Sequence, residues 1–461
     1  MIIFATGNQQ DIEMVYYRRK VDEELLAWKS SDRRMPLLLR GARQVGKSTA
    51  VRQLGKTFKY YVEVNLERQP SVGKLFTDDI DVKRTCGALS AMTGVPILAG
   101  ETLLFIDEIQ VSKAAVMSLR YFKEEYGELH VIAAGSLLEF TLEELPSFGV
   151  GRIRSMYMYP FSFDEFVEAQ GLRELVKYKR KASADEPLPE AMHRQLTDLL
   201  KTFYLIGGMP AAVREWIETG SYLECGRVHN DILETYQDDF SKYKKRVSPT
   251  LLRKVLHSVA LQAGQKFTFS RVDSDTHTGT IKEALRLLTL AGLIVPVTHT
   301  DANGVPLGAE EDDRYVKYLF VDLGLMQTML NTPASDVLLA SDVDFVSRGA
   351  ASEMFAGLEM MKYGDSFRRA EMHYWQSMSR NGNAEVDYLT CRGGVVVPVE
   401  VKANTRGSMQ SLWLFMRKKN LTKAIRTSLE NYGRLEYIDK ENGGAVRMVD
   451  IVPLYGLSTL L

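Results

Sequence analysis

The chain has 461 residues, of which 45% are hydrophobic and 25% are charged. These are ordinary values for a soluble globular protein, and they exclude collagen-like, disordered and disulfide-scaffold classes. Because a domain averages about 150 residues, the length predicts about three domains. The 58 lysines and arginines nearly balance the 59 aspartates and glutamates. Any contact with nucleic acid must therefore come from a local basic patch rather than from the overall charge.

The cysteines and the apolar runs bear on the cellular location of the protein. The 3 cysteines, Cys86, Cys225 and Cys391, are too few and too scattered for a disulfide framework, so we expect a reducing, cytoplasmic location. No C-x-x-C or H-E-x-x-H motif predicts a zinc site. The N-terminal residues do not have the pattern of a signal peptide. No apolar stretch reaches the roughly 20 residues that span a bilayer, so we expect no membrane partner.

The first third of the chain alternates short apolar runs with amphipathic segments, as α/β domains do. Five of these runs are typical of strands, and helical segments separate them. They lie at residues 36–40, 61–65, 103–106, 131–134 and 155–160. We therefore expect a parallel sheet that helices cover on both faces.

The middle of the chain is mainly helical from residue 161 onward, with a polar, proline-bearing surface loop at residues 177–189. Residues 251–297 then follow the order helix, loop, helix and strand. An acid-rich stretch at 301–313 predicts a hairpin tip, and residues 318–321 predict the returning strand. This order of elements predicts a winged helix.

A glycine-rich segment directly after the first predicted strand matches the phosphate-binding pattern G-x-x-x-x-G-K-[ST]. Its glycines let backbone N–H groups turn toward phosphate oxygens, and the following helix adds its positive N-terminal end. We expect Lys47 to reach the β- and γ-phosphates of ATP and Ser48 to hold Mg²⁺. The alternative is a glycine-rich turn that matches by chance. The candidate nucleotide-binding residues are Gly41, Ala42, Arg43, Gln44, Val45, Gly46, Lys47, Ser48, Thr49 and Ser136.

A second motif supports this assignment. A buried strand at 103–106 delivers Asp107 and Glu108 at its carboxyl end, where open α/β sheets bind ligands. We expect Asp107 to bind the shell of the Mg²⁺ ion and Glu108 to orient or deprotonate the attacking water. The alternative is an acidic pair that faces solvent. With the glycine-rich loop upstream, both halves of the machinery for ATP binding and hydrolysis are present.

The Asp-Glu pair is typical of P-loop ATPases that place an extra strand between the P-loop strand and the Asp107 strand. Residues 131–134 are the candidate for that extra strand, and Ser136 after it would contact the γ-phosphate or the water. Ser136 could equally cap a helix. Arg152 is a candidate arginine finger, acting in trans if the protein forms a homo-oligomer, or else an ordinary surface arginine.

Several segments in this order resemble a widespread prokaryotic family of AAA-type ATPases: GARQVGKST, LLFIDEIQ, AAGSLLEF, the GR before YPFSFDEF, and FYLIGGMPAAV. Members of that family carry a C-terminal domain of unknown function, often with a restriction-endonuclease-like core. The resemblance implies an α/β fold with a P-loop NTPase sheet of the AAA+ (ASCE) class. It implies an ATPase core at residues 1–160, a helical lid at 161–243, a winged helix at 244–330 and an α/β nuclease-like domain at 331–461.

The C-terminal region offers its own candidate site. Glu400 lies near the end of a predicted strand at 395–401, and Lys402 directly follows that strand. The two side chains lie on the same face, because strand side chains alternate with a period of two. Asp387 lies on the preceding strand and Glu353 on the helix before it. These four residues would form a PD-(D/E)xK-type site, in which Asp387 and Glu400 bind Mg²⁺ or Mn²⁺. Lys402 would stabilise the phosphate or position the nucleophile. No Pro-Asp dipeptide precedes the hairpin, which leaves an inert nuclease-like scaffold as the alternative.

A basic stretch before the winged-helix candidate suggests a face for duplex DNA. It comprises Lys242, Lys244, Lys245, Arg246, Arg253 and Lys254, with Arg271, Lys282 and Arg286 nearby. The alternatives are a solvated charged face or a surface for a protein partner. The leading interpretation is therefore an AAA-type ATPase whose nucleotide state controls a DNA-associated C-terminal module. The other interpretation is a nucleotide-gated switch or scaffold that engages a protein partner and carries an inert tail.

Overall fold

The computed structural model describes most of the chain and divides it into two compact units. The described residues are 15–460 except 78–79, 145–150, 244–245, 339–348, 379–383, 403–408 and 440–442. The first unit comprises residues 1–160 and 365–369, and the second comprises residues 161–364 and 370–461. No helix in the described part of the chain combines the length and the apolar character that crossing a bilayer requires.

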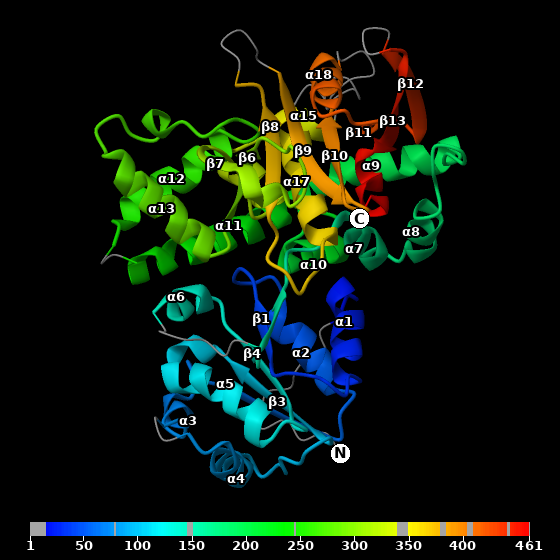
Figure 1. Cartoon of the computed structure of the whole chain (residues 1–461). Coiled ribbons are helices and arrows are strands. Elements are labelled where there is room, and N and C mark those ends of the chain that lie inside the picture. The colour runs from blue at the N-terminus through cyan, green and yellow to red at the C-terminus, as the bar shows by residue number, and fades with distance from the viewer. Residues whose placement is uncertain are drawn as a thin grey trace. The chain divides into compact units, whose positions relative to one another are not determined.

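The first unit is built on a parallel five-stranded sheet, drawn in blue and cyan with its helices in Figure 1. The strand order is β2-β3-β4-β1-β5, and every neighbouring pair is parallel. The strands are β1 (Leu37–Arg40), β2 (Tyr60–Asn65), β3 (Thr102–Asp107), β4 (His130–Ala134) and β5 (Arg154–Tyr157). The prediction of a parallel sheet is confirmed. The extra strand expected between the P-loop strand and the Asp107 strand is β4, which lies between β1 and β3.

The strands β3 and β4 in the middle of this sheet are buried because their sequences are largely apolar. All six residues of β3 and all five of β4 are buried, as expected for strands covered on both faces. The connecting helices begin at side-chain caps where the sequence offers them, such as Asp81 before α4 and Ser112 before α5. The helices are α1 (Lys20–Lys29), α2 (Lys47–Gly55), α3 (Pro70–Gly73), α4 (Val82–Thr93), α5 (Lys113–Glu125) and α6 (Leu138–Glu143).

The second unit contains an eight-stranded mixed sheet in the order β12-β13-β11-β10-β9-β8-β6-β7. Figure 1 shows β8, β9, β10 and β11 of this sheet side by side, in orange tones. The strands are β6 (Ile294–Thr300), β7 (Glu311–Phe320), β8 (Met372–Gln376), β9 (Glu385–Arg392), β10 (Val395–Val401), β11 (Lys423–Ser428), β12 (Gly433–Asp439) and β13 (Ala445–Pro453).

The helices of the second unit fall before, between and after these strands. Those before β6 are α7 (Phe163–Ala169), α8 (Arg173–Lys179), α9 (Glu190–Ile206), α10 (Pro210–Thr219), α11 (Tyr222–Asp239), α12 (Pro249–Leu261) and α13 (Thr278–Leu290). The later ones are α14 (Leu323–Met329), α15 (Ala334–Leu338), α17 (Gly349–Tyr363), α18 (Gln410–Lys418) and the short η6 (Leu454–Thr459).

The predicted helix, loop, helix and strand order is present as α12, α13 and the antiparallel hairpin of β6 and β7. The hairpin is not separate from the C-terminal strands. β6 pairs with β7 on one side and in parallel with β8 on the other. One sheet therefore runs across the boundary that the sequence placed between residues 330 and 331.

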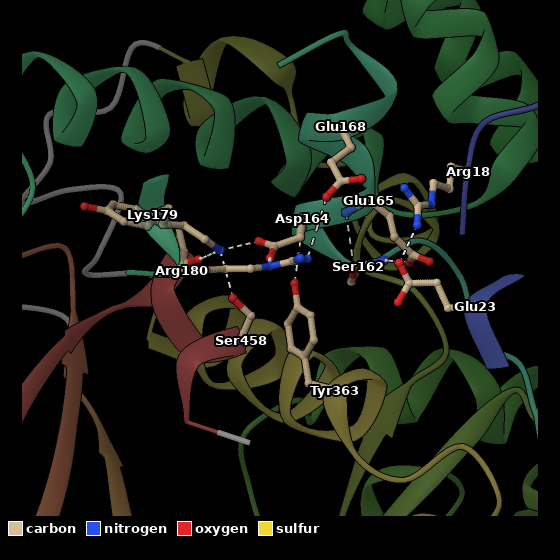
Figure 2. A network of polar contacts seen from close by, with 11 residues as sticks. Arg18, Glu23, Ser162, Asp164, Glu165, Glu168, Lys179, Arg180, Tyr363 and Ser458 are labelled. Carbon is tan, nitrogen blue, oxygen red and sulfur yellow. Dashed lines mark hydrogen bonds and ion pairs between the residues drawn. The ribbon is translucent and has the colours of Figure 1, made fainter. Parts of the chain in front are cut away.

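A buried ionic network holds the helical and C-terminal parts of the second unit together (Figure 2). The ammonium group of Lys179, fully buried, pairs with Asp164 and donates to the Tyr455 carbonyl at 2.8 Å and to Ser458 Oγ at 2.9 Å. The Asp164 N–H donates to the Tyr363 hydroxyl at 3.2 Å. Removing one partner of a buried ion pair leaves an uncompensated charge. This network, which joins α7, α8, α17 and η6, is therefore a structural element of the unit.

Candidate functional site

The phosphate-binding loop lies between β1 and α2, where the sequence placed it. Gly41 has φ +142°, and a Cβ there would lie 2.1 Å from the Met158 carbonyl oxygen, so only glycine fits. Within this segment Ala42 and Val45 are buried, whereas Gln44 and Thr49 are exposed. Helix α2 begins at Lys47 directly after Gly46. The N-terminal end of a helix offers N–H groups and the positive end of the helix dipole, as an anion site requires.

Lys47 is buried and folded back onto the loop. Its ammonium donates to the carbonyl oxygens of Gly41 at 2.8 Å and Ala42 at 2.7 Å. Burial lowers the pKa of Lys47 to about 8, although the nearby Glu108 and Asp107 carboxylates raise it. Neutral carbonyls compensate an ammonium only in part, so this cation is available for a more strongly charged partner such as a phosphate.

Asp107 and Ser48 meet at the carboxyl edge of the sheet. Ser48 Oγ donates to Asp107 Oδ2 at 3.0 Å, and Asn65 Nδ2 from β2 donates to the same oxygen at 3.3 Å. Burial raises the pKa of the Asp107 carboxyl, and the neighbouring Glu108 charge raises it further. A hydroxyl and a carboxylate at this separation are the hard oxygen donors that Mg²⁺ prefers. Ser48 and Asp107 therefore fit the Mg²⁺ ion that we expected them to hold.

Glu108 is held by three donors on one oxygen. Gln110 Nε2 donates to Glu108 Oε2 at 2.6 Å, while Ser136 approaches the same oxygen with its hydroxyl at 3.2 Å and its N–H at 3.4 Å. The backbone of Glu108 is left-handed, with φ +50°, which turns the chain sharply at the end of β3. Ser136 therefore contacts the proposed base directly.

Gln110 was not among the residues selected from the sequence. A Cβ on Gly135 would lie 1.9 Å from Gln110 Oε1, so glycine at that position makes room for the amide. Gln110 stands two positions after Glu108 in the LLFIDEIQ segment, but its role depends on the turn at Glu108. Arg43 lies at the loop and lowers the pKa of Lys47 through its charge. Arg152 forms an ion pair with Glu124 on α5 and is 49% exposed.

The second unit brings a set of carboxylates together. One oxygen each from Glu353 on α17 and from Glu385 and Asp387 on β9 lie within 4.8 Å of one another, close enough to share a metal ion. Lys317 on β7 donates to Glu353 Oε1 at 2.8 Å and also pairs with Glu385. The sequence indicated Glu353 and Asp387 but gave Glu385 no role and did not indicate Lys317.

Glu400 and Lys402 adjoin this set. Lys402 Nζ lies 2.5 Å from Glu400 Oε1, and the Val401 N–H donates to Asp387 Oδ2 at 2.7 Å. Glu400 is 2% exposed, and its Oε2 has no hydrogen-bond partner among the described residues. Burial and the Asp387 charge raise the pKa of Glu400 to about 8, and the same two causes raise the pKa of Glu353 to about 8.

We name Glu353, Glu385, Asp387 and Glu400 the carboxylate cluster. An orphaned buried carboxylate oxygen and raised carboxyl pKa values both indicate that the positive charge nearby is insufficient. Carboxylate oxygens are suitable ligands for Mg²⁺ or Mn²⁺. The residues present therefore fit a divalent cation.

Three parts of the chain match known protein families. Residues 33–167 match an AAA domain, residues 197–336 match a domain of unknown function (DUF8612), and residues 348–454 match a second one (DUF4143). The chain carries an AAA-type ATPase domain. The sequence resemblance to AAA-type ATPases with a C-terminal domain of unknown function is confirmed at this level.

Two individual proteins resemble this chain more loosely. An uncharacterized protein from Methanocaldococcus jannaschii is 22% identical over 263 residues, which cover 55% of this chain. The match covers 53% of the length of that relative. The crystal structure of a signal transduction ATPase with numerous domains and a tetratricopeptide repeat sensor, from Pyrococcus horikoshii, is 13% identical. It matches with a TM-score of 0.27 over 76% of this chain and 48% of that chain.

The basic stretch lies in the segment between the AAA domain and the C-terminal domain. Three of its cations form ion pairs, Lys242 with Asp239, Lys254 with Asp273, and Arg286 with Glu283, at 2.7 to 2.8 Å. Arg271 donates to Gln265 Oε1 at 2.8 Å, and Lys282 lies 5.8 Å from the ring centre of Phe269. Arg246 and Arg253 are exposed. Lys244 and Lys245 lie outside the described residues.

Proposed function

We propose that the AAA domain binds ATP with Mg²⁺ and hydrolyses it. The observation that carries this proposal is the meeting of two contacts at one edge of the sheet. Ser48 donates to Asp107, and Gln110 and Ser136 donate to Glu108. The phosphates would draw Lys47 away from the carbonyls of the loop, and Ser48 and Asp107 would hold Mg²⁺.

Glu108 is the proposed general base. The three donors meet at Oε2, so the other carboxylate oxygen is assigned to the attacking water. That water would attack the γ-phosphorus and the bond to the β–γ bridging oxygen would break, which gives ADP and phosphate. The proton of the water would pass to Glu108. The candidate nucleotide residues Gly41 to Thr49 would surround the phosphates through the N–H groups of the loop.

Arg152 remains a proposed arginine finger for a neighbouring copy in a homo-oligomer. Its exposure supports this role, because a finger must reach out of its own subunit. The ion pair with Glu124 would have to open first. If the protein is instead a nucleotide-gated switch, the AAA domain would engage a protein partner in place of a second copy of this chain.

A second proposed site is the carboxylate cluster, which would bind Mg²⁺ or Mn²⁺. Its supporting observation is the orphaned, buried Oε2 of Glu400 beside Asp387. When bound, the metal would activate water for cleavage of a phosphodiester. Lys402 would stabilise the charged phosphate, as in a PD-(D/E)xK-type nuclease. Under this proposal the nucleotide state of the AAA domain controls a DNA-associated module.

One assay tests both sites. ATP turnover is measured with and without duplex DNA, in Mg²⁺ and in Mn²⁺, and the integrity of the DNA is followed in the same samples. Glu108→Gln should retain ATP binding and lower turnover by about 100-fold or more, because it removes the base. Asp387→Asn should leave turnover unchanged and abolish any cleavage. Normal turnover in Glu108→Gln would refute the assignment of the base, and intact DNA with the wild type would leave the cluster as a scaffold.

A further inference from the structure

Lys317 is an unusual residue for the position it holds. It lies in the interior of β7, opposite Val297 of β6, and only 3% of its side chain is exposed. Placing an ammonium group inside a protein costs free energy unless an opposite charge compensates it. The compensation comes from residues that are 36 and 68 positions away in the sequence.

The contacts of Lys317 fall on the carboxylate cluster. Its Nζ donates to Glu353 Oε1 at 2.8 Å and pairs with Glu385, and it lies 4.9 Å from the ring centre of Tyr374. Burial by itself would lower the pKa of Lys317, but Glu353, Glu385 and Asp387 raise it above its ordinary value. The side chain therefore carries a full positive charge at neutral pH.

The two lysines beside the cluster pair with different numbers of its carboxylates. Lys317 forms ion pairs with Glu353 and Glu385, while Lys402 forms an ion pair with Glu400 at 2.5 Å. Four carboxylates face two ammonium groups, so a fully ionised cluster would keep an excess of two negative charges. One divalent cation would balance that excess.

A divalent cation and the ammonium of Lys317 cannot share these oxygens without repulsion. Mg²⁺ or Mn²⁺ would lie about 2.0–2.2 Å from a carboxylate oxygen. The ammonium already lies 2.8 Å from Glu353 Oε1. Two cations on one buried oxygen would be about 5 Å apart or less, where the protein interior screens charge poorly.

We propose that Lys317 is an internal counter-ion that competes with a divalent cation for Glu353 and Glu385. The metal would load fully only when the ammonium moves away from these carboxylates. This inference rests on the proposed cation site at the carboxylate cluster. It assigns the strand β7, which lies outside the matched C-terminal domain, a direct part in that site.

The test compares Mn²⁺ binding to the nucleotide-free, full-length chain by calorimetry. Lys317→Met removes the charge and keeps an unbranched apolar side chain, so Mn²⁺ should bind at least about tenfold more tightly than to the wild type. Lys317→Arg keeps the charge and should bind Mn²⁺ no more tightly than the wild type does. Circular dichroism and thermal melting verify that each variant is folded. If Lys317→Met does not fold, Lys317→Gln provides the same comparison.

Asp387→Asn identifies which site takes up the metal. Combined with Lys317→Met, it should abolish the gain, because the P-loop site is the same in every variant. Equal Mn²⁺ affinity at the cluster with and without Lys317 would overturn the competition and leave the cation site standing. If folded wild type and Lys317→Met both show no binding that depends on Asp387, the cation site and the competition fail together.

Discussion

Gln110 places its amide against the carboxylate that we propose as the catalytic base. Its Nε2 makes the shortest of the three contacts to Glu108 Oε2, at 2.6 Å. Glu108 itself stands at a left-handed turn, and the three donors fix the direction of its carboxylate. A base that is free to rotate loses its alignment with the water, and alignment contributes strongly to rate.

Gln110→Ala should therefore lower kcat for ATP hydrolysis by about tenfold or more and leave KM nearly unchanged. The binding loop at residues 41–49 does not include Gln110, so ATP affinity, measured by fluorescence titration, should match that of the wild type. Gln110→Asn, which keeps a shorter amide, should recover part of the loss. Wild-type kcat in Gln110→Ala would show that Ser136 alone orients the base.

Single residues were predictable where they belong to a motif of neighbouring positions in the sequence. Lys47, Ser48, Asp107 and Glu108 belong to motifs, and the structure brings them to one edge of a sheet. Lys317 reaches Glu353 from another strand, through space. No local pattern distinguishes such a lysine from one that faces solvent, so the sequence could not identify it.

The elements of the first unit follow from the sequence more closely than those of the second. The predicted strands at 103–106 and 131–134 lie inside β3 and β4. Buried parallel strands are continuous apolar runs, which a sequence shows directly. The pairing of β6 with β8 joins residues about 75 positions apart, and strand partners at that distance leave no trace in periodicity.

The hairpin of β6 and β7 bears on the proposed DNA face. Its tip lines an acidic pocket that includes Asp301, Glu310 and Asp313. These carboxylates would repel a phosphate backbone. A duplex would therefore have to avoid this tip and contact the basic stretch, of which Arg246 and Arg253 are exposed.

If the basic stretch is a face for duplex DNA, the affinity for DNA should depend on the salt concentration. The affinity for duplex DNA should fall as salt rises, because phosphate contacts release counterions. Changing Lys244, Lys245 and Arg246 together to Ala should reduce the log–log slope by about 0.9 for each true contact. The measurement is a fluorescence anisotropy titration at several salt concentrations. Arg314→Ala, which removes an arginine paired with Asp312 on the hairpin, is the control and should leave the slope unchanged. The same slope in the triple variant and the wild type would exclude this stretch.

At the scale of the whole molecule, the structure has two compact units, and one sheet of the second unit spans residue 330. The first unit ends at residue 160, but residues 365–369 also belong to it. The sheet of the second unit continues from β7 to β12 through strands on both sides of residue 330. Composition marks where a linker begins, but it cannot show that a later strand returns to an earlier sheet.

The carboxylate cluster gives the second unit a stability that depends on pH. Burial, together with the Asp387 charge, raises the pKa of Glu353 and of Glu400 from 4.5 to about 8 in the folded chain. The folded state therefore binds protons more tightly than the unfolded state does between these values. Stability follows the difference in bound protons, so the free energy of unfolding should decrease as pH rises from about 5 to about 8. Lys317 remains protonated throughout this range and does not alter the sign.

Chemical denaturation followed by tryptophan fluorescence would measure this trend in the full-length chain. Of the 4 tryptophans, Trp28 lies in the first unit, and the others, Trp216, Trp375 and Trp413, lie in the second. Denaturation of a Trp28→Phe background therefore reports on the second unit alone. The denaturant concentration at its midpoint should decrease as pH rises from about 5 to about 8. Glu353→Gln combined with Glu400→Gln should flatten this decrease, because neither amide titrates. Saturating Mn²⁺ should raise the midpoint most at the upper end of this range, where the cluster is ionised. A midpoint that does not change with pH in the background variant would mean that both carboxyls are already ionised near neutrality.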